Sequence, residues 1–164
     1  GVLNAGGFAT LLADVLTEEE EGGFENRFDI VLLTSRLVGV TNSIVTHAEL
    51  GNLPVGYFGA STGAASALAA TAESGERIRA VVSRGGRPDL AAPYLHTVKS
   101  PTLFIVGGFD EQVIELNKSA FEELTCEKKM VIVEGATHLF EEPGKLAEVA
   151  QLAKAWFKKH LVMK

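Results

Sequence analysis

The chain has 164 residues, of which 46% are hydrophobic and 22% charged, and its formal net charge is −6 at pH 7. This length and balance predict a single globular domain, residues 1–164, with enough apolar sequence to bury a core. The acidic balance argues against a nucleic-acid partner, and no apolar run reaches the roughly 18 residues that a membrane span needs. The one cysteine, Cys126, excludes an internal disulfide and favours a reducing compartment, so we expect a cytoplasmic protein.

The first third of the chain predicts few regular elements. Residues 1–5 resemble the end of a helix that a glycine pair stops. The apolar run 8–14 predicts a buried strand, and the polar, glutamate-rich stretch 16–28 predicts a solvated loop. Apolar residues recur at helical spacing in 30–47, which indicates an amphipathic helix.

Strands and helices alternate in the rest of the chain. The apolar runs that predict strands are 55–60, 78–83, 101–106 and 129–133, with helices predicted over 64–74, 112–124 and from Pro143 to about residue 160. A loop is expected at 84–89. This rhythm predicts an α/β fold with a mainly parallel sheet, and the nearly continuous apolar strands indicate helices on both of its faces.

The central motif is Gly59-Ala60-Ser61-Thr62-Gly63, which matches the G-x-S-x-G nucleophile elbow. A serine on so tight a strand-to-helix turn needs small residues two positions before and after it. The turn would expose Ser61 Oγ and would point the Thr62 N–H at a developing oxyanion. The alternative is that Ser61 is only a helix N-cap in a glycine-rich turn.

Two further reactive residues follow later strands. Asp110 comes after the strand at 101–106 and His138 after the strand at 129–133, so both belong at the edge of the sheet that carries Ser61. A neutral imidazole can remove the serine proton near pH 7, and a carboxylate behind it fixes the tautomer. The order Ser, Asp, His is the order of an α/β-hydrolase triad.

Simpler interpretations exist for both residues. Asp110 could only cap the helix that begins at Glu111, and His138 could be a loop histidine bonded to backbone. The carboxylates that could replace Asp110 are Glu111, Glu141 and Glu142. The sequence shows no His/Cys/Asp cluster with metal-ligand spacing and no nucleotide-binding glycine motif, so no cofactor is expected.

Three segments in this order resemble the α/β-hydrolase superfamily, most closely its dienelactone hydrolase branch: LPVGYFGASTGAASAL, PTLFIVGGFDEQV and VIVEGATHLFEEPG. The resemblance implies hydrolysis of a small-molecule ester through an acyl-serine, with Ser61 as nucleophile, His138 as base and Asp110 as its orienting acid. Dienelactone hydrolases proper carry cysteine at the elbow. Serine at position 61 therefore favours a general carboxylesterase.

The resemblance also implies strands before residue 1 and a His-Gly loop that supplies a second oxyanion donor. The sequence contains no His-Gly pair, so we expect a domain without the family's first strands and with Thr62 as its remaining donor. The absent strand would lie between 8–14 and 55–60. We therefore expect either direct pairing of these two segments or closure of the gap by a second copy in a homodimer.

Other functional classes remain open at this point. A non-catalytic α/β-hydrolase-like module that binds a ligand or a partner is the alternative to a serine hydrolase. An acyltransferase could use the same serine with a different acceptor.

Overall fold

The computed structural model describes residues 1–162 and contains one four-stranded sheet in the order β1-β2-β3-β4. All three strand pairs are parallel, which confirms the predicted fold class. The strands are β1 (Val55–Ala60), β2 (Ile78–Arg84), β3 (Thr102–Gly107) and β4 (Lys128–Val133). Each lies within two residues of its predicted limits.

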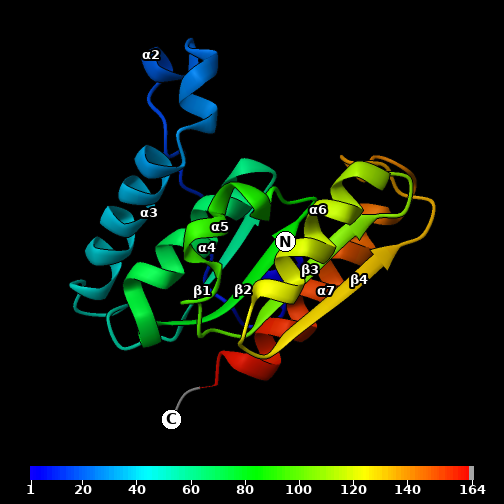
Figure 1. Ribbon diagram of the computed structural model, residues 1–164. Coiled ribbons are helices and arrows are strands. Elements are labelled where there is room, and N and C mark those ends of the chain that lie inside the picture. Colours follow the sequence, from blue (N-terminus) through cyan, green and yellow to red (C-terminus); the bar gives the residue numbers. More distant parts are fainter. Residues whose placement is uncertain (163–164) are drawn as a thin grey trace.

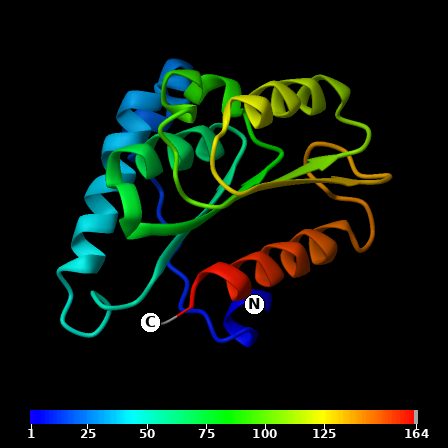
Figure 2. The same cartoon turned by 60° about the horizontal axis from the view of Figure 1, so that its bottom comes forward.

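Helices cover both faces of the sheet (Figures 1 and 2). One face carries α3 (Ile30–Val45), α4 (Thr62–Ser74), α5 (Ala92–Leu95) and α6 (Glu111–Glu123), and the other carries α1 (Val2–Ala5) and α7 (Lys145–His160). The short remaining elements are α2 (Glu18–Glu21), η1 (Phe24–Phe28), η2 (Gly75–Arg77) and η3 (Pro88–Ala91). No helix in residues 1–162 is both long enough and apolar enough to cross a membrane.

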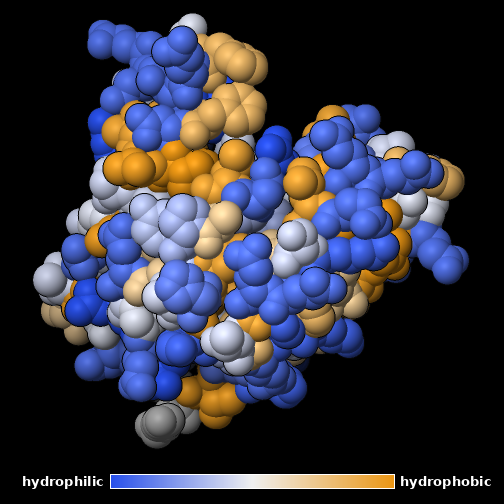
Figure 3. Space-filling view, in the orientation of Figure 1, coloured by the Kyte–Doolittle hydropathy of each residue, from blue (hydrophilic) through white to orange (hydrophobic). Residues whose placement is uncertain are grey.

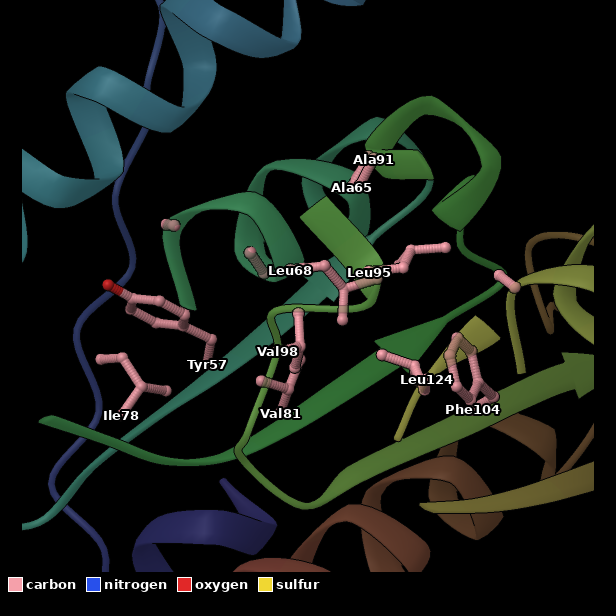
Figure 4. Packing of buried hydrophobic residues seen from close by; sticks show 13 residues of the cluster. Tyr57, Ala65, Leu68, Ile78, Val81, Ala91, Leu95, Val98, Phe104 and Leu124 are labelled. Carbon is pink, nitrogen blue, oxygen red and sulfur yellow. The ribbon is translucent and has the colours of Figure 1, made fainter. Parts of the chain in front are cut away.

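Two apolar clusters fill the space between the sheet and its helices. The cluster beneath α4 contains Tyr57, Leu68, Val81 and Phe104 among its buried side chains (Figure 4). The cluster beneath α7 is formed by residues that include Val82, Leu103, Phe140, Trp156 and Phe157. Neighbouring strand residues point to opposite faces, so the consecutive valines of β2 belong to different clusters.

The strand expected at 8–14 is absent, and this prediction is wrong. Residues 8–15 have no regular secondary structure. Phe8 still packs edge-on against Phe157, with ring centroids 6.1 Å apart, but Leu11 and Leu12 are 63% and 96% exposed. The physical reason is pairing: an apolar segment forms a strand only when a neighbouring strand accepts its hydrogen bonds, and no strand of residues 1–162 pairs with it.

The segment 16–28 is also more regular than expected. It forms α2 and η1, which rise above the sheet with the start of α3 (Figure 1). Thr17 and Glu20 make a reciprocal capping box, and four glutamates occupy the first turn, where the positive end of the helix dipole stabilises them. The acidic run is therefore solvated, as predicted, but it is helical.

Smaller corrections concern the other segments. The predicted helix at 30–47 is confirmed as α3, whose N-cap Asp29 accepts a bond of 3.0 Å from the Leu32 N–H. The loop expected at 84–89 is shorter, because β2 extends to Arg84 and η3 begins at Pro88. Proline at the first position of a helix costs no hydrogen bond.

β1 is an edge strand, since it pairs with β2 alone. The expected pairing of residues 8–14 with β1 is therefore wrong. Phe58 in the middle of β1 is 43% exposed. The alternative expectation, a homodimer across this edge, stays a prediction.

Candidate active site

The turn between β1 and α4 holds Ser61 in an unusual backbone conformation, with φ 50° and ψ −123°. Non-glycine residues seldom adopt a positive φ, and such strain is found mostly at functional sites. Gly59 permits the turn because a Cβ there would overlap the Gly63 carbonyl oxygen and lie 2.6 Å from Ala64 Cα. The local geometry is that of a tight strand-to-helix turn, as the motif predicted.

Ser61 occupies the N-cap position of α4, yet its side chain makes no capping hydrogen bond. The simple capping role is therefore absent, and Oγ is free for another use. Thr62 is the first residue of α4, so its N–H is one of the donors that have no partner inside the helix. The first turn thus presents a backbone donor directly beside the serine.

Asp110 and His138 are in contact at the carboxyl ends of the parallel strands, the end of the sheet at which Ser61 also lies. His138 Nδ1 lies 2.6 Å from Asp110 Oδ2, although the two residues are 28 positions apart in the chain. The aspartate side chain is 16% exposed and the histidine side chain 40%. The expected contact between these residues is present, and it leaves Nε2 as the ring nitrogen available to a reacting group.

The alternative interpretations of these two residues lack support. Asp110 is the N-cap residue of α6 but makes no side-chain capping bond, because its carboxylate is turned to His138. Glu142 Oε1 instead accepts a bond of 3.0 Å from the Thr137 N–H, which holds the histidine loop. Hydrogen bonding by the Thr137 side chain, and to a smaller extent by its backbone, lowers the pKa of Glu142. Neither Glu111 nor Glu141 hydrogen-bonds His138.

Ser61 and His138 both contact the segment that follows β2, at Arg84 and Gly85. The Ser61 N–H donates to the Arg84 carbonyl at 3.3 Å, and the next residue, Gly85, packs against the imidazole. A Cβ on Gly85 would lie 3.5 Å from His138 Cε1 and 3.6 Å from Nδ1. No hydrogen bond joins Ser61 Oγ to the imidazole within residues 1–162, and such bonds are often loose before a substrate is bound.

Two arginines near the serine differ in their charge partners. Arg87 makes a bidentate pair with Asp89, with bonds of 2.9 and 2.7 Å. Arg84 has no acidic partner among residues 1–162; its guanidinium lies 5.6 Å from the centroid of the Phe140 ring. Burial lowers the pKa of Arg84. The sequence predicted only a loop for this segment, although the glycine pair at 85–86 is a signal of close backbone approach.

An open cavity of about 260 Å³ lies beside the first turn of α4. Its lining comes from the N-terminal third of the chain and from the elbow: Ala13, Asp14, Val15, Leu16, Glu21, Arg27, Leu33, Thr62 and Gly63. The cavity therefore borders Thr62, the residue that follows Ser61. Within residues 1–162 no group of three or more His, Cys, Asp or Glu side chains is placed to hold a metal ion.

The chain resembles several known proteins, although no family model matches it. The crystal structure of a dienelactone hydrolase from Anabaena variabilis is 55% identical, with a TM-score of 0.94 over 98% of this chain and 76% of that one. An esterase domain from Rhodothermus marinus aligns with a TM-score of 0.67 at 18% identity, over 79% of this chain and 70% of that one. The second match shows a shared fold only.

A curated Mycobacterium tuberculosis protein, called "Putative phosphoribosyl transferase" in two strains, is 56% identical over 160 residues. The match covers 98% of this chain but 36% of that protein, so the chain spans about a third of the length of these relatives. The Anabaena enzyme, by contrast, is matched over most of its length at 55% identity. The chain therefore belongs to the dienelactone hydrolase-like family of α/β-hydrolases.

Proposed function

We propose that this chain is a serine hydrolase that cleaves a carboxylic ester through an acyl-serine intermediate. The observation that carries the proposal is the placement of the strained Ser61 at the same sheet edge as the His138–Asp110 pair, with its 2.6 Å contact. Serine at the elbow supports a general carboxylesterase rather than an enzyme specific for dienelactones. The transferase name of the longer M. tuberculosis relatives has no support in these residues.

In the first half of the reaction, Ser61 Oγ attacks the ester carbonyl while His138 Nε2 takes the hydroxyl proton. Asp110 accepts the Nδ1–H bond, which keeps the correct tautomer and stabilises the imidazolium. The carbonyl oxygen becomes an oxyanion and accepts a bond from the Thr62 N–H. The imidazolium then gives its proton to the departing alkoxide, and the acyl group stays on Oγ.

In the second half, water attacks the acyl-serine. His138 Nε2 removes a proton from the water and returns it to Ser61 Oγ as the acid leaves. The Thr62 N–H is the oxyanion donor that this turn supplies, and one such donor is worth about 10²–10³ in kcat.

Covalent labelling tests this proposal directly. A fluorophosphonate probe should label Ser61, and peptide mapping should place the adduct on the 55–74 region. Wild-type protein should hydrolyse p-nitrophenyl acetate faster than Ser61→Ala. Equal labelling and equal turnover of both proteins would reject the serine mechanism.

One observation favours a second candidate, a non-catalytic module that binds a partner. The free edge of β1 with its half-exposed Phe58 is a surface on which another chain could add a strand. Absence of labelling, together with a partner that blocks deuterium exchange of the β1 amides, would favour this alternative.

A further inference from the structure

The short segment 84–87 lies next to all three parts of the proposed triad. It contacts Ser61 and His138 directly, and it contacts α6, the helix that begins after Asp110. Ser61 is tied to it at both backbone groups. Its N–H donates to the Arg84 carbonyl at 3.3 Å, and its carbonyl accepts from the Arg87 N–H at 3.0 Å. A residue with a strained backbone keeps its conformation only when its surroundings over-determine it, and this segment supplies both bonds.

The same segment borders the imidazole. Gly85 has φ +50°, a conformation that brings its backbone close to His138, so that a Cβ there would lie 3.2 Å from the His138 carbonyl oxygen. The Gly85 N–H donates to the Ile105 carbonyl at 2.8 Å, which anchors the segment to β3. Any shift of the segment therefore changes the distance between the serine and the histidine.

One side chain from another element holds this segment in place. Asn117 on α6 is fully buried, and its Nδ2 donates to the Gly86 carbonyl at 3.0 Å and to the Val113 carbonyl at 2.8 Å. On its other side Gly86 packs so closely that a Cβ there would overlap Ser83 Oγ and lie 2.7 Å from Ala64 Cβ. Gly86 is thus held between Ser83 and Ala64 on one side and bonded to the Asn117 amide through its carbonyl.

The helix that carries this amide also begins at the acid. Asp110 is the N-cap residue of α6, and Asn117 lies two turns later on the same helix. The contacts form a closed path from Ser61 through the segment to Asn117, along α6 to Asp110, across to His138 and back to Gly85. A rigid helix at this point couples the position of the acid to the position of the serine.

We propose that Asn117 is a positioning residue of the hydrolase site, which aligns Ser61 with His138 by holding the Gly86 carbonyl. It touches neither substrate nor reacting atoms. This inference rests on the proposed function, because it assigns a role within the Ser61–His138–Asp110 mechanism.

The test compares Asn117→Leu, of similar size but without donors, with Thr71→Val. Thr71 is a matched control because its buried hydroxyl donates to the Ala67 carbonyl at 2.7 Å on α4, about 15 Å along the helix from Ser61. Asn117→Leu loses two buried hydrogen bonds and Thr71→Val loses one. With p-nitrophenyl acetate, Asn117→Leu should lower kcat about 100-fold and leave KM within threefold, since misalignment affects the reaction more than binding. Thr71→Val should keep kcat within twofold.

A second variant serves if Asn117→Leu does not fold. The carboxyl of Asn117→Asp, fully buried, has a raised pKa, and in its neutral form its O–H can donate to the Gly86 carbonyl. When it ionises, it repels the Gly86 and Val113 carbonyls. The kcat of this variant relative to wild type should therefore fall as the pH rises from 6 to 9, whereas the ratio for Thr71→Val stays flat.

The outcomes separate this inference from the proposed function. A wild-type protein no faster than Ser61→Ala would reject the hydrolase and this role with it. An active wild type, with folded Asn117→Leu within threefold of it in kcat, would overturn the positioning role alone. A pH-independent ratio for Asn117→Asp would do the same.

Discussion

The two parts of this chain differ sharply in how much they bury. Residues 1–54 contribute three buried side chains, Leu33, Thr34 and Thr41, all on α3. The remaining buried side chains of the described residues lie after residue 54, in the sheet, in its helices and in the loops that join them. The space-filling view shows the same contrast, with apolar side chains exposed on the raised part that carries α2 (Figure 3).

The proposed reactive residues all lie in the packed part, and the contrast explains why. A positive φ at Ser61 costs about 1–3 kcal/mol, which only dense surroundings can impose. The N-terminal part instead exposes Leu12, Phe24 and Val31 at 96%, 73% and 70%. Regions with few buried apolar contacts open locally at low free energy, so they cannot hold reacting groups within a fraction of an ångström.

The largest expected effect is the loss of esterase activity after substitutions in the packed part, compared with a substitution in the N-terminal part. Ser61→Ala and His138→Ala should each lower the kcat for p-nitrophenyl acetate at least about 10³-fold, and the double variant should lose little more, because the residues act as a unit. Asp110→Asn should cost less than either. In the N-terminal part, Phe24→Ser should leave kcat within threefold. Additive losses in the double variant would contradict the shared mechanism.

Two glycine substitutions, one in each part of the chain, should change the free energy of unfolding in opposite directions. Gly59→Ala should destabilise the fold by about 1–3 kcal/mol, because the new Cβ lies 2.6 Å from Ala64 Cα in the packed elbow. Gly39→Ala on α3 meets no atom within 4 Å and should stabilise by about 0.5–1 kcal/mol, since alanine is the better helix former. Urea unfolding measures both. A loss of stability in Gly39→Ala would show that the N-terminal part is packed more tightly than its exposure indicates.

The free edge of β1, the first strand after the N-terminal part, can be tested by self-association of the chain. We predict a homodimer that buries Phe58, which is 43% exposed in the single chain. Burying the remaining 43% of Phe58 contributes about 1 kcal/mol, less than half of the value for a fully exposed side chain, so Phe58→Lys should weaken the dimer at least about fivefold. Sedimentation velocity over a concentration series measures this change. A strict monomer at every concentration would remove the homodimer prediction.

The smallest expected effect concerns a buried hydrogen bond between the two parts. Tyr57 on β1 and Thr41 on α3 share a hydrogen bond of 2.6 Å between their hydroxyls. Tyr57→Phe should cost about 0.5–1.5 kcal/mol at pH 8. Burial raises the pKa of Tyr57, so its contribution is present below about pH 10 and is lost as the pH rises through the raised value. Urea unfolding at pH 8 and 10.5 should therefore show a steeper decline for wild type than for the variant, and equal declines would contradict this reasoning.

The sequence by itself determined the elements of the packed part and pointed to its proposed reactive residues. Apolar runs and helical spacing are local signals, so β1 to β4, α4 and α6 were predicted within a few residues of their observed limits. The G-x-S-x-G spacing predicted the strained turn at Ser61, because only small neighbours fit so tight a backbone. The placement of Asp110 and His138 after parallel strands predicted their contact.

Only the tertiary structure decided the conformation of residues 8–14 and the contacts of Asn117. An apolar run predicts a strand, but backbone hydrogen bonds need a neighbour that no local pattern reveals, and these residues have none. Asn117 is one polar residue in an amphipathic helix, and nothing in its sequence context distinguishes it from a solvated one. Its proposed role comes from the Gly86 carbonyl, 31 positions away in the chain, which the packing of α6 against η3 and β3 brings within 3.0 Å.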